Sequence, residues 1–358
     1  MAHTGRSALS AWALVLLLLL AVVFASNHAA ADDEVPDACD ACSCQGSPLV
    51  VKSCWTNLTS IPANIPLTAT ILYFQKTSIT SIAPYAFSGM SSLTRIYLYN
   101  SQITEIALNA FAGLPALQLL HLSNNPITSL PDYGFSSLSS VSELYLANTQ
   151  LTTLSAHAFD GMSSLTYLYL AGNLVSSVAP NTFSSLYSLR FLHLFNTKLT
   201  TLPVDAIGGL SALEELHLYR SNIASIPPNA FMGLNLISLR VLGLITSLPS
   251  NAFNGMSSLT SLSLNGNPIT SFTDTAFAGL FSLTLLNLYS TQITSIPANA
   301  FADLYSLNVL NLFSNQITNI PSETFTALSA LTQLNMVGTR ITSIPDNAFN
   351  GLSSLTML

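Results

Sequence analysis

Residues 117–135 read LQLLHLSNNPITSLPDYGF, and this stretch decides the fold because its spacing returns along almost the whole chain. Its last residue, Phe135, belongs to a series of positions along the chain, and ten of the eleven steps between successive members are 24 residues long. Self-similarity at a period of about 20–50 residues is the mark of a solenoid built from stacked units. The series is Phe87, Phe111, Phe135, Phe159, Phe183, Ile207, Phe231, Phe253, Phe277, Phe301, Phe325 and Phe349.

A second apolar series follows six positions behind the first. Within one unit Leu120 and Leu122 are two positions apart, so they lie on one face of a short strand while His121 points to the other face. Stacked units therefore predict a parallel sheet with a leucine interior and a second buried ridge of phenylalanines, and no unit folds alone. The second series is Leu93, Leu117, Val141, Leu165, Leu189, Leu213, Ile237, Leu259, Leu283, Leu307, Leu331 and Leu355.

After the second interior leucine the chain turns, and its buried backbone N–H and C=O groups need partners. One position in each unit carries four Asn and seven Thr or Ser residues, whose side chains bond backbone groups at turns. We expect this ladder to satisfy the turns. It consists of Thr77, Ser101, Asn125, Thr149, Asn173, Thr197, Ser221, Asn267, Thr291, Asn315 and Thr339.

Written as L-x-x-L-x-L-x-x-N-x-I, the unit beginning at Leu117 resembles the leucine-rich repeat. Residues 67–358 are similar to extracellular leucine-rich repeats, and residues 39–66 resemble the cysteine-rich N-terminal cap of that family. The unit ending ItsIPxnaFxgL resembles variable lymphocyte receptors most closely, and also Toll-like receptors and Slit-type guidance proteins. The resemblance implies an α/β leucine-rich-repeat solenoid, a horseshoe with a concave parallel β-sheet, an irregular convex side and a disulfide N-terminal cap.

The N-terminal residues have the composition of a secretory signal peptide. Arg6 precedes an apolar run from Ala11 to Ala25, and small residues end at Ala31 before an acidic stretch. An uncleaved membrane anchor is the alternative, but the run is shorter than the roughly 20 apolar residues that a spanning helix needs. Because no second long apolar run occurs, we expect a protein that is secreted or on the extracellular face of the plasma membrane, without a membrane span in the mature chain.

All four cysteines lie close together, between Cys39 and Cys54, and in an oxidising compartment they indicate a disulfide clip. Of the three possible pairings, the one containing Cys42–Cys44 is disfavoured, because one intervening residue rarely permits disulfide geometry, and two pairings stay open. A zinc site is the alternative, but the spacing lacks two well-separated CxxC pairs. By similarity to the family cap we expect Cys39–Cys44 and Cys42–Cys54. Asn57 lies in the only N-x-[ST] sequon and is a candidate glycosylation site.

Composition excludes several functional classes. Charged residues make up 7% of the chain, against roughly a quarter in an ordinary domain, and the net charge is −7. The cations are scattered and form no stripe that neutralises phosphates, so we expect no nucleic-acid partner. The sequence lacks G-x-S-x-G, H-E-x-x-H, P-loop and G-x-G-x-x-G motifs and repeats the same residue types in each unit, so we expect neither an enzyme nor a cofactor.

Aromatic side chains gather at strand positions that point away from the leucine interior, in two columns on the concave face. Folding does not require so many aromatic residues there, whereas protein-binding surfaces are enriched in them. The alternative is that the rings stack along the ladder and stabilise neighbouring units. The candidate ligand-binding residues are Tyr73, Tyr97, Tyr99, His121, Tyr145, Tyr169, His193, Phe195, His217, Tyr219, Tyr289 and Phe313.

Two histidines on this face raise the question of a metal. His193 and His217 fall on neighbouring strands, with Glu215 on the same face. A zinc pair is conceivable, but two histidines without a further assured ligand are weak support for it. We therefore expect ordinary surface side chains and no metal site.

One unit is irregular, because the step from Phe231 to Phe253 is two positions shorter than the others and the Asn equivalent is lost. The register of its strand is ambiguous. We expect a tolerated deletion with a local kink; the alternative is a bend that separates two stretches of binding surface.

These inferences predict a recognition protein that binds a macromolecular ligand, a protein or glycan, on its concave face, as an immune receptor does. The alternatives are an extracellular-matrix adhesion or spacer protein and the ectodomain fragment of a signalling receptor. We divide the chain into a signal peptide 1–31, a cap 32–66 and about twelve repeats in 67–358, of which the last is truncated. Since the chain ends at Leu358 partway through a strand motif, we expect a C-terminal cap or anchor to be missing.

Overall fold

A computed structural model of the chain describes residues 50–52, 58–63 and 65–358. The predicted signal peptide, the four cysteines and the sequon residue Asn57 lie outside the described residues, so the expectations about secretion, disulfide pairing and glycosylation stay predictions. Within the described part, no helix is long and apolar enough to cross a membrane.

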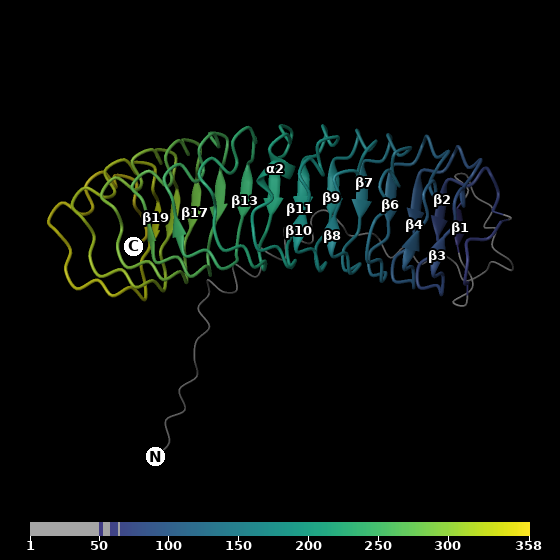
Figure 1. Cartoon of the computed structure of the whole chain (residues 1–358). Coiled ribbons are helices and arrows are strands. Elements are labelled where there is room, and N and C mark those ends of the chain that lie inside the picture. Colours follow the sequence, from purple (N-terminus) through teal and green to yellow (C-terminus); the bar gives the residue numbers. More distant parts are fainter. Residues whose placement is uncertain (1–49, 53–57, 64) are drawn as a thin grey trace, which may run out of the picture. The chain divides into compact units, whose positions relative to one another are not determined.

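Among the described residues, thirteen short parallel strands form one sheet, with one strand from each successive turn of the chain (Figure 1). In most strands the central residue is buried and the flanking residues are half-buried, as the spacing of Leu120 and Leu122 predicts. The register advances by one repeat from strand to strand, for example from Leu120 to Leu144. The strands, in sheet order, are β1 (Val50–Lys52), β2 (Ile71–Tyr73), β4 (Arg95–Tyr97), β6 (Leu119–His121), β7 (Glu143–Tyr145), β9 (Tyr167–Tyr169), β11 (Phe191–His193), β12 (Glu215–His217), β13 (Ser238–Arg240), β15 (Ser261–Ser263), β17 (Leu285–Asn287), β18 (Val309–Asn311) and β19 (Gln333–Asn335).

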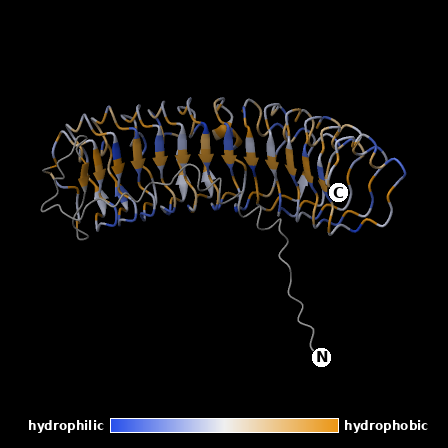
Figure 2. Ribbon diagram, turned by 180° about the vertical axis from the view of Figure 1, so that it is seen from behind, coloured by the Kyte–Doolittle hydropathy of each residue, from blue (hydrophilic) through white to orange (hydrophobic). Residues whose placement is uncertain are grey.

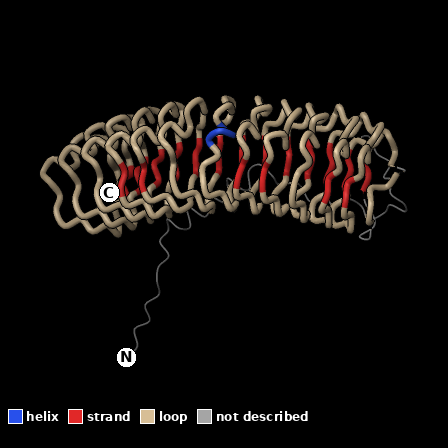
Figure 3. Tube along the Cα trace, in the orientation of Figure 1, coloured by secondary structure: helices blue, strands red, loops and turns tan. Residues whose placement is uncertain are grey.

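The remainder of each turn is loop, apart from short elements (Figure 3). In the part of the chain that the structure describes, three two-stranded parallel pairs occur, and the helix is α2 (Val204–Ile207), in the unit where Ile207 replaces phenylalanine. The solenoid with one parallel sheet and an irregular opposite side is therefore confirmed. The pairs are β3 (Ser81–Ile82) with β5 (Glu105–Ile106), β8 (Thr153–Leu154) with β10 (Ser177–Val178), and β14 (Ser247–Leu248) with β16 (Ser271–Phe272).

The core is one continuous cluster that runs through the stack, and the apolar strand residues follow one another along it (Figure 2). The phenylalanines form the second ridge that the sequence predicts. Phe87 and Phe111 have ring centroids 5.7 Å apart, and Phe253 and Phe277 have centroids 6.0 Å apart. Each fully buried side chain contributes about 1.5–3 kcal/mol, most of which depends on the neighbouring turns that cover it.

The polar ladder satisfies the turns, as predicted. The Asn125 amide donates to the carbonyls of Leu122 and Leu98, both at 2.8 Å, and its oxygen accepts from the Ile103 N–H at 3.1 Å. The Thr149 hydroxyl donates to a carbonyl of its own turn at 3.0 Å. An Asn therefore joins two successive turns, and each buried backbone group that it bonds is spared the cost of being unpaired.

The irregular unit corrects one assignment. The sequence pattern places Ile237 in the buried series, but Ile237 is 42% exposed and Leu236 is fully buried in its place. The register is unambiguous, since Ser238 pairs with Glu215 on one side and with Ser261 on the other. Each of these two steps is one position shorter than a regular repeat, so the deletion is divided between the segments before and after β13. The inward position shifts to Leu236 because the chain is one residue shorter before the strand.

Candidate ligand-binding surface

The open face of the sheet carries three columns of side chains. One precedes the buried residue of each strand, one follows it, and the third lies two positions further along the chain. Every strand thus places side chains outward from the same two or three positions, and the register of the sheet aligns them with their equivalents on the next strand.

From β2 to β12 the ring-bearing residues contact one another without a gap. Tyr73 and Tyr97 stack with centroids 4.6 Å apart and planes 5° from parallel. His121 stacks on Tyr145 at 4.9 Å. The third column joins in through Phe195, which stacks on Tyr219 at 4.5 Å. The other predicted members in this part are Tyr99, Tyr169, His193 and His217, and we call the whole set the aromatic face.

Two predicted residues lie apart from this run of rings. Tyr289 and Phe313 lie beyond the irregular unit, where the column that follows the buried residue becomes Ser263, Asn287 and Asn311. Phe313 is 40% exposed. The structure therefore assigns the continuous ring surface to the strands from β2 to β12.

The rings of the column that precedes the buried residue are absent from the sequence-based prediction. Tyr167 packs against Tyr145 at 5.6 Å and against His193 at 5.2 Å, and Phe191 packs against Tyr167 at 5.7 Å. The signal was present, since strand alternation places every second residue on the same face. We add Tyr167 and Phe191 to the aromatic face.

His193 differs from the expectation of an ordinary surface side chain, because it is buried, with 9% exposure. The rings of Tyr167, Tyr169 and Phe195 surround it, and His217 stacks on it with centroids 4.5 Å apart and planes 12° from parallel. Bulky neighbours on both flanking strands cover a position that alternation alone predicts to be open.

Burial shifts the pKa values of the titratable rings on the aromatic face. It lowers the pKa of His121 to about 4, that of His193 to about 4 and that of His217 to about 3, the last with help from His193 and Arg240. Burial also raises the pKa of Tyr145, whose hydroxyl donates to Glu143 at 2.7 Å. At neutral pH these rings are uncharged, which favours contacts with apolar and hydrogen-bonding groups.

A small pocket of about 190 Å³ lies at the C-terminal end of the aromatic face. The guanidinium of Arg240 lies over the ring of Tyr219, 5.1 Å from its centroid, and this cation–π contact closes the run of rings. Arg240 is missing from the sequence-based prediction because the register of its strand is ambiguous in the sequence. The pocket is lined by Tyr219, Arg220, Arg240, Val241, Leu242, Ser263 and Asn265.

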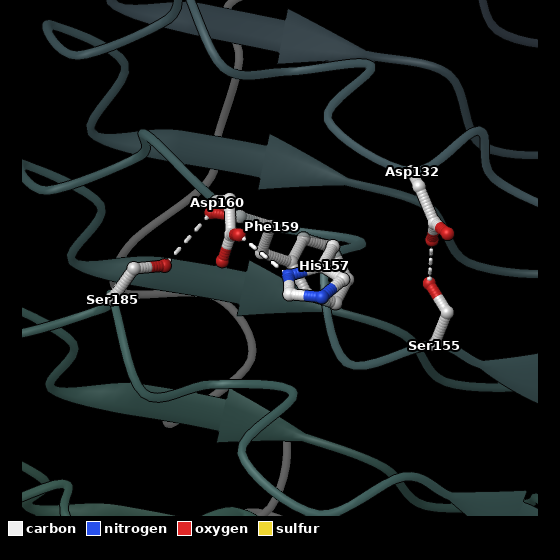
Figure 4. A network of polar contacts seen from close by, with 6 residues as sticks. All are labelled: Asp132, Ser155, His157, Phe159, Asp160 and Ser185. Carbon is white, nitrogen blue, oxygen red and sulfur yellow. Dashed lines mark hydrogen bonds and ion pairs between the residues drawn. The ribbon is translucent and has the colours of Figure 1, made fainter.

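A polar cluster around His157 contains serine, histidine and aspartate, the residue types of a catalytic triad, but not their arrangement (Figure 4). His157 Nδ1 and Asp160 Oδ2 are 2.9 Å apart, but the hydroxyl of Ser155 donates to Asp132 and that of Ser185 donates to the Phe159 carbonyl. Neither hydroxyl bonds the imidazole, so this cluster has no nucleophile and base in contact.

Family descriptions of repeats match most of the chain. The description "BspA type Leucine rich repeat region" matches residues 176–308 and 224–356, and the description "Leucine rich repeat" matches residues 68–127, 117–175 and 139–199. Both describe repeats rather than an enzyme. Comparison with curated protein sequences gave no significant match.

Solved structures share the architecture. A leucine-rich-repeat protein of Leptospira interrogans is 27% identical with a TM-score of 0.69, over 84% of this chain and 75% of that chain. Drosophila Toll, in a Toll–Spatzle complex, is 21% identical with a TM-score of 0.74, over 81% of this chain and 41% of that one. TLR13, in a complex with ssRNA13, is 24% identical with a TM-score of 0.57, over 80% and 49%.

The two receptor likenesses are below 25% identity and show the fold alone, and this chain spans less than half of each receptor chain. The repeat matches, by contrast, extend together over residues 68–356, the same turns that build the parallel sheet. The chain therefore belongs to the leucine-rich-repeat family.

Proposed function

We propose that this chain is a secreted or cell-surface recognition protein that binds a macromolecular ligand, a protein in the first place, on the aromatic face. One observation carries the proposal: an uninterrupted surface of rings from Tyr73 to Tyr219 at positions that the leucine core does not use. Secretion and the narrower likeness to variable lymphocyte receptors, drawn from the sequence, are part of the same proposal.

The rings suit recognition because they are already held in place. Tyr73, Tyr97 and Tyr169 are half-buried, and each ring rests on a ring of the next strand, so little side-chain freedom is left to lose on binding. Rigid aromatic residues supply large contact area at small entropic cost and keep a polar group for hydrogen bonding. Neutral histidines among them add donors and acceptors without charge.

A protein ligand fits this face better than a nucleic acid. The chain carries a net charge of −7, and Arg95 is the one cation among the strand residues from β2 to β12. Phosphate backbones need several cations for appreciable affinity. Toll is complexed with Spatzle and TLR13 with ssRNA13 in the structures above, so single-stranded RNA belongs in the test as the competing ligand class.

Stacking along the ladder supports the second candidate, a structural spacer or adhesion protein of the extracellular matrix. Neighbouring cross-strand pairs are worth about 0.2–1 kcal/mol each, and the contact of Tyr73 with Tyr97 is of this kind. In that function the rings would stabilise the stack and contact no partner.

The experiment is a binding screen followed by affinity measurement. The secreted protein is tested against arrayed extracellular proteins and against single-stranded RNA, and every ligand found is titrated against the variant Tyr97→Ala/Tyr145→Ala/Tyr169→Ala. Because each truncated hot-spot aromatic costs about 2 kcal/mol or more, two true contacts weaken the affinity by roughly a thousandfold.

Two controls make the result specific. Asn287→Ala/Asn311→Ala/Asn335→Ala removes three side chains from the equivalent column beyond the irregular unit and is expected to leave binding unchanged. Leu144→Ala lies in the core and is expected to cost about 2–5 kcal/mol of stability. A triple-tyrosine variant that remains folded and binds every ligand normally contradicts the proposal and favours the spacer.

A further inference from the structure

Three side chains with metal-binding atoms meet inside the aromatic face. His193 and His217 are register partners on β11 and β12, and Glu215 lies two positions before His217, on the same side of the sheet. Their potential ligand atoms all lie within 4.8 Å of one another. The sequence alone supports zinc only weakly, for want of an assured third ligand, and the fold supplies it.

The buried histidine has one nitrogen in use and one without a partner. His193 Nδ1 is 3.3 Å from the hydroxyl of Tyr167, while the buried Nε2 has no hydrogen-bond partner. With the proton on Nδ1, donated to the Tyr167 oxygen, Nε2 carries a free lone pair. A buried polar atom of this kind is costly unless something binds it.

We propose that His193, His217 and Glu215 bind one divalent transition-metal ion, Zn²⁺ in the first place, on the open face of the sheet. Two imidazoles and one carboxylate are ligands that zinc accepts, whereas Ca²⁺ and Mg²⁺ require mostly oxygen ligands. Three protein ligands leave the fourth position of a tetrahedral ion to water or to a donor atom of a bound molecule.

The ligand atoms are near zinc-binding distances, but the two stacked imidazoles must turn so that both lone pairs point to one ion. Metal–ligand distances of about 2.0–2.2 Å place two ligand atoms of a tetrahedral zinc ion roughly 3.4 Å apart. His217 Nε2 and Glu215 Oε2 are already 3.6 Å apart. No separation in the set exceeds 4.8 Å, so the longest must shorten by at most about 1.4 Å when an ion binds.

Some neighbouring groups favour binding of the ion and one opposes it. Tyr167 acts on His193 as the outer hydrogen-bond partner that metal-bound histidines commonly have, fixing the ring and its tautomer. Glu215 supplies a negative charge. Arg240, the register partner of His217 on β13, opposes the ion by its positive charge, while its guanidinium is held over Tyr219.

The test is calorimetric titration of the full chain with Zn²⁺ after treatment with a chelator, and with Mg²⁺ as the negative probe. Free thiols are first alkylated, so that the four cysteines do not contribute zinc ligands. The variants His217→Gln and Glu215→Gln keep the shape of each side chain, and His157→Gln removes a half-exposed histidine outside the cluster. Melting curves without metal establish that each variant is folded.

We expect the wild-type chain and His157→Gln to bind the same number of zinc equivalents. His217→Gln and Glu215→Gln should each lose one equivalent or weaken it at least about tenfold, and Tyr167→Phe should weaken it about 10–100-fold while keeping the site. Substitution with Co²⁺ should give the visible spectrum of a tetrahedral ion in the wild type and not in His217→Gln. Equal zinc binding by the wild type and the two folded ligand variants, or binding of Mg²⁺ with similar affinity, overturns the proposal.

Discussion

Leu239 lies directly opposite Leu216 in the sheet, although the chain between them is one position shorter than between regularly spaced strands. The same is true of Leu239 and Leu262 on the other side. One residue is missing from the turn after β13, and Gly243 stands where other turns have Asn, Thr or Ser. This turn therefore contributes no side chain to the polar ladder. The Gly243 N–H donates to the side-chain oxygen of Asn267 in the next turn, at 2.8 Å, as the Thr149 N–H donates to Asn173 in a regular turn. The deletion is thus absorbed by the loops, and the sheet continues through it.

The first prediction concerns Gly243, because the shortened turn leaves no room there for a side chain. A Cβ at Gly243 would lie 2.6 Å from the Ile223 carbonyl oxygen, whereas a Cβ at Gly209 has open space. We expect Gly243→Ala to lower the free energy of unfolding by about 1–3 kcal/mol through overpacking. Gly209→Ala is the matched control and is expected to be neutral or stabilising by about 0.4–1 kcal/mol. Denaturant unfolding of both variants measures the difference, and equal stabilities would show that the turn at Gly243 relaxes freely.

The polar ladder gives a second prediction. The Asn173 amide donates to the carbonyls of Leu146 and Leu170, at 2.7 and 2.8 Å. Its oxygen accepts from the N–H and the hydroxyl of Thr149. Asn173→Ala removes the partner of the buried Leu170 carbonyl and of the Thr149 N–H, while the Thr149 hydroxyl keeps the Leu146 carbonyl, and we expect a loss of about 3–5 kcal/mol. The exposed control Asn222→Ala should change stability by less than about 0.5 kcal/mol. Similar melting temperatures for the two variants would mean that water replaces the amide.

The repeat positions were predictable because each is fixed by the same requirement in every turn. Leu120 and Leu144 must be buried wherever strands of this spacing stack, and Asn125 must serve a turn whose backbone is inside. A single sequence does not resolve cases in which two residues compete for one position. Leu236 and Ile237 are both apolar, and only the pairing of Ser238 on both sides decides between them.

The candidate site was predictable as a face but not as a set of contacts. Alternation places His193 on the open side, yet its burial depends on how Tyr167, Tyr169 and Phe195 lean over it. Such leaning follows from ring packing between strands of successive turns, which residue spacing does not encode. Alternation also places Glu215 on the face of the two histidines, but the proximity of its carboxylate to both imidazoles depends on the same packing.

The last prediction concerns pH and one histidine. His121 packs against rings on both neighbouring strands, and burial lowers its pKa to about 4, below the ordinary value of 6.5. The titratable and charged groups that its neighbouring elements carry on this face are Arg95, Tyr97, Tyr99, Glu143 and Tyr145. The folded protein therefore keeps this imidazole neutral at pH values at which the unfolded chain already protonates it.

Because the unfolded state binds the proton first, stability falls as the pH drops through 6.5 and stops falling from this cause below about 4. Above pH 6.5 both states are neutral, and the histidine contributes no pH dependence. Between pH 7.5 and pH 4.5 the shift corresponds to a loss of about 2 kcal/mol, at about 1.4 kcal/mol for each pKa unit. Other groups titrate in the same interval, so only a difference between variants isolates His121.

The measurement is chemical unfolding of the wild type and His121→Gln at both pH values. Glutamine takes up no proton, so the gap in unfolding free energy between wild type and variant should shift by about 2 kcal/mol in favour of the variant at pH 4.5. His157→Gln, which removes a half-exposed imidazole outside the aromatic face, is measured alongside as the control for the loss of a histidine. If the gap for His121→Gln is the same at both pH values, the buried imidazole already takes up its proton in the folded state. The aromatic face would then be more open to water around His121 than the ring contacts with Tyr99 and Tyr145 imply.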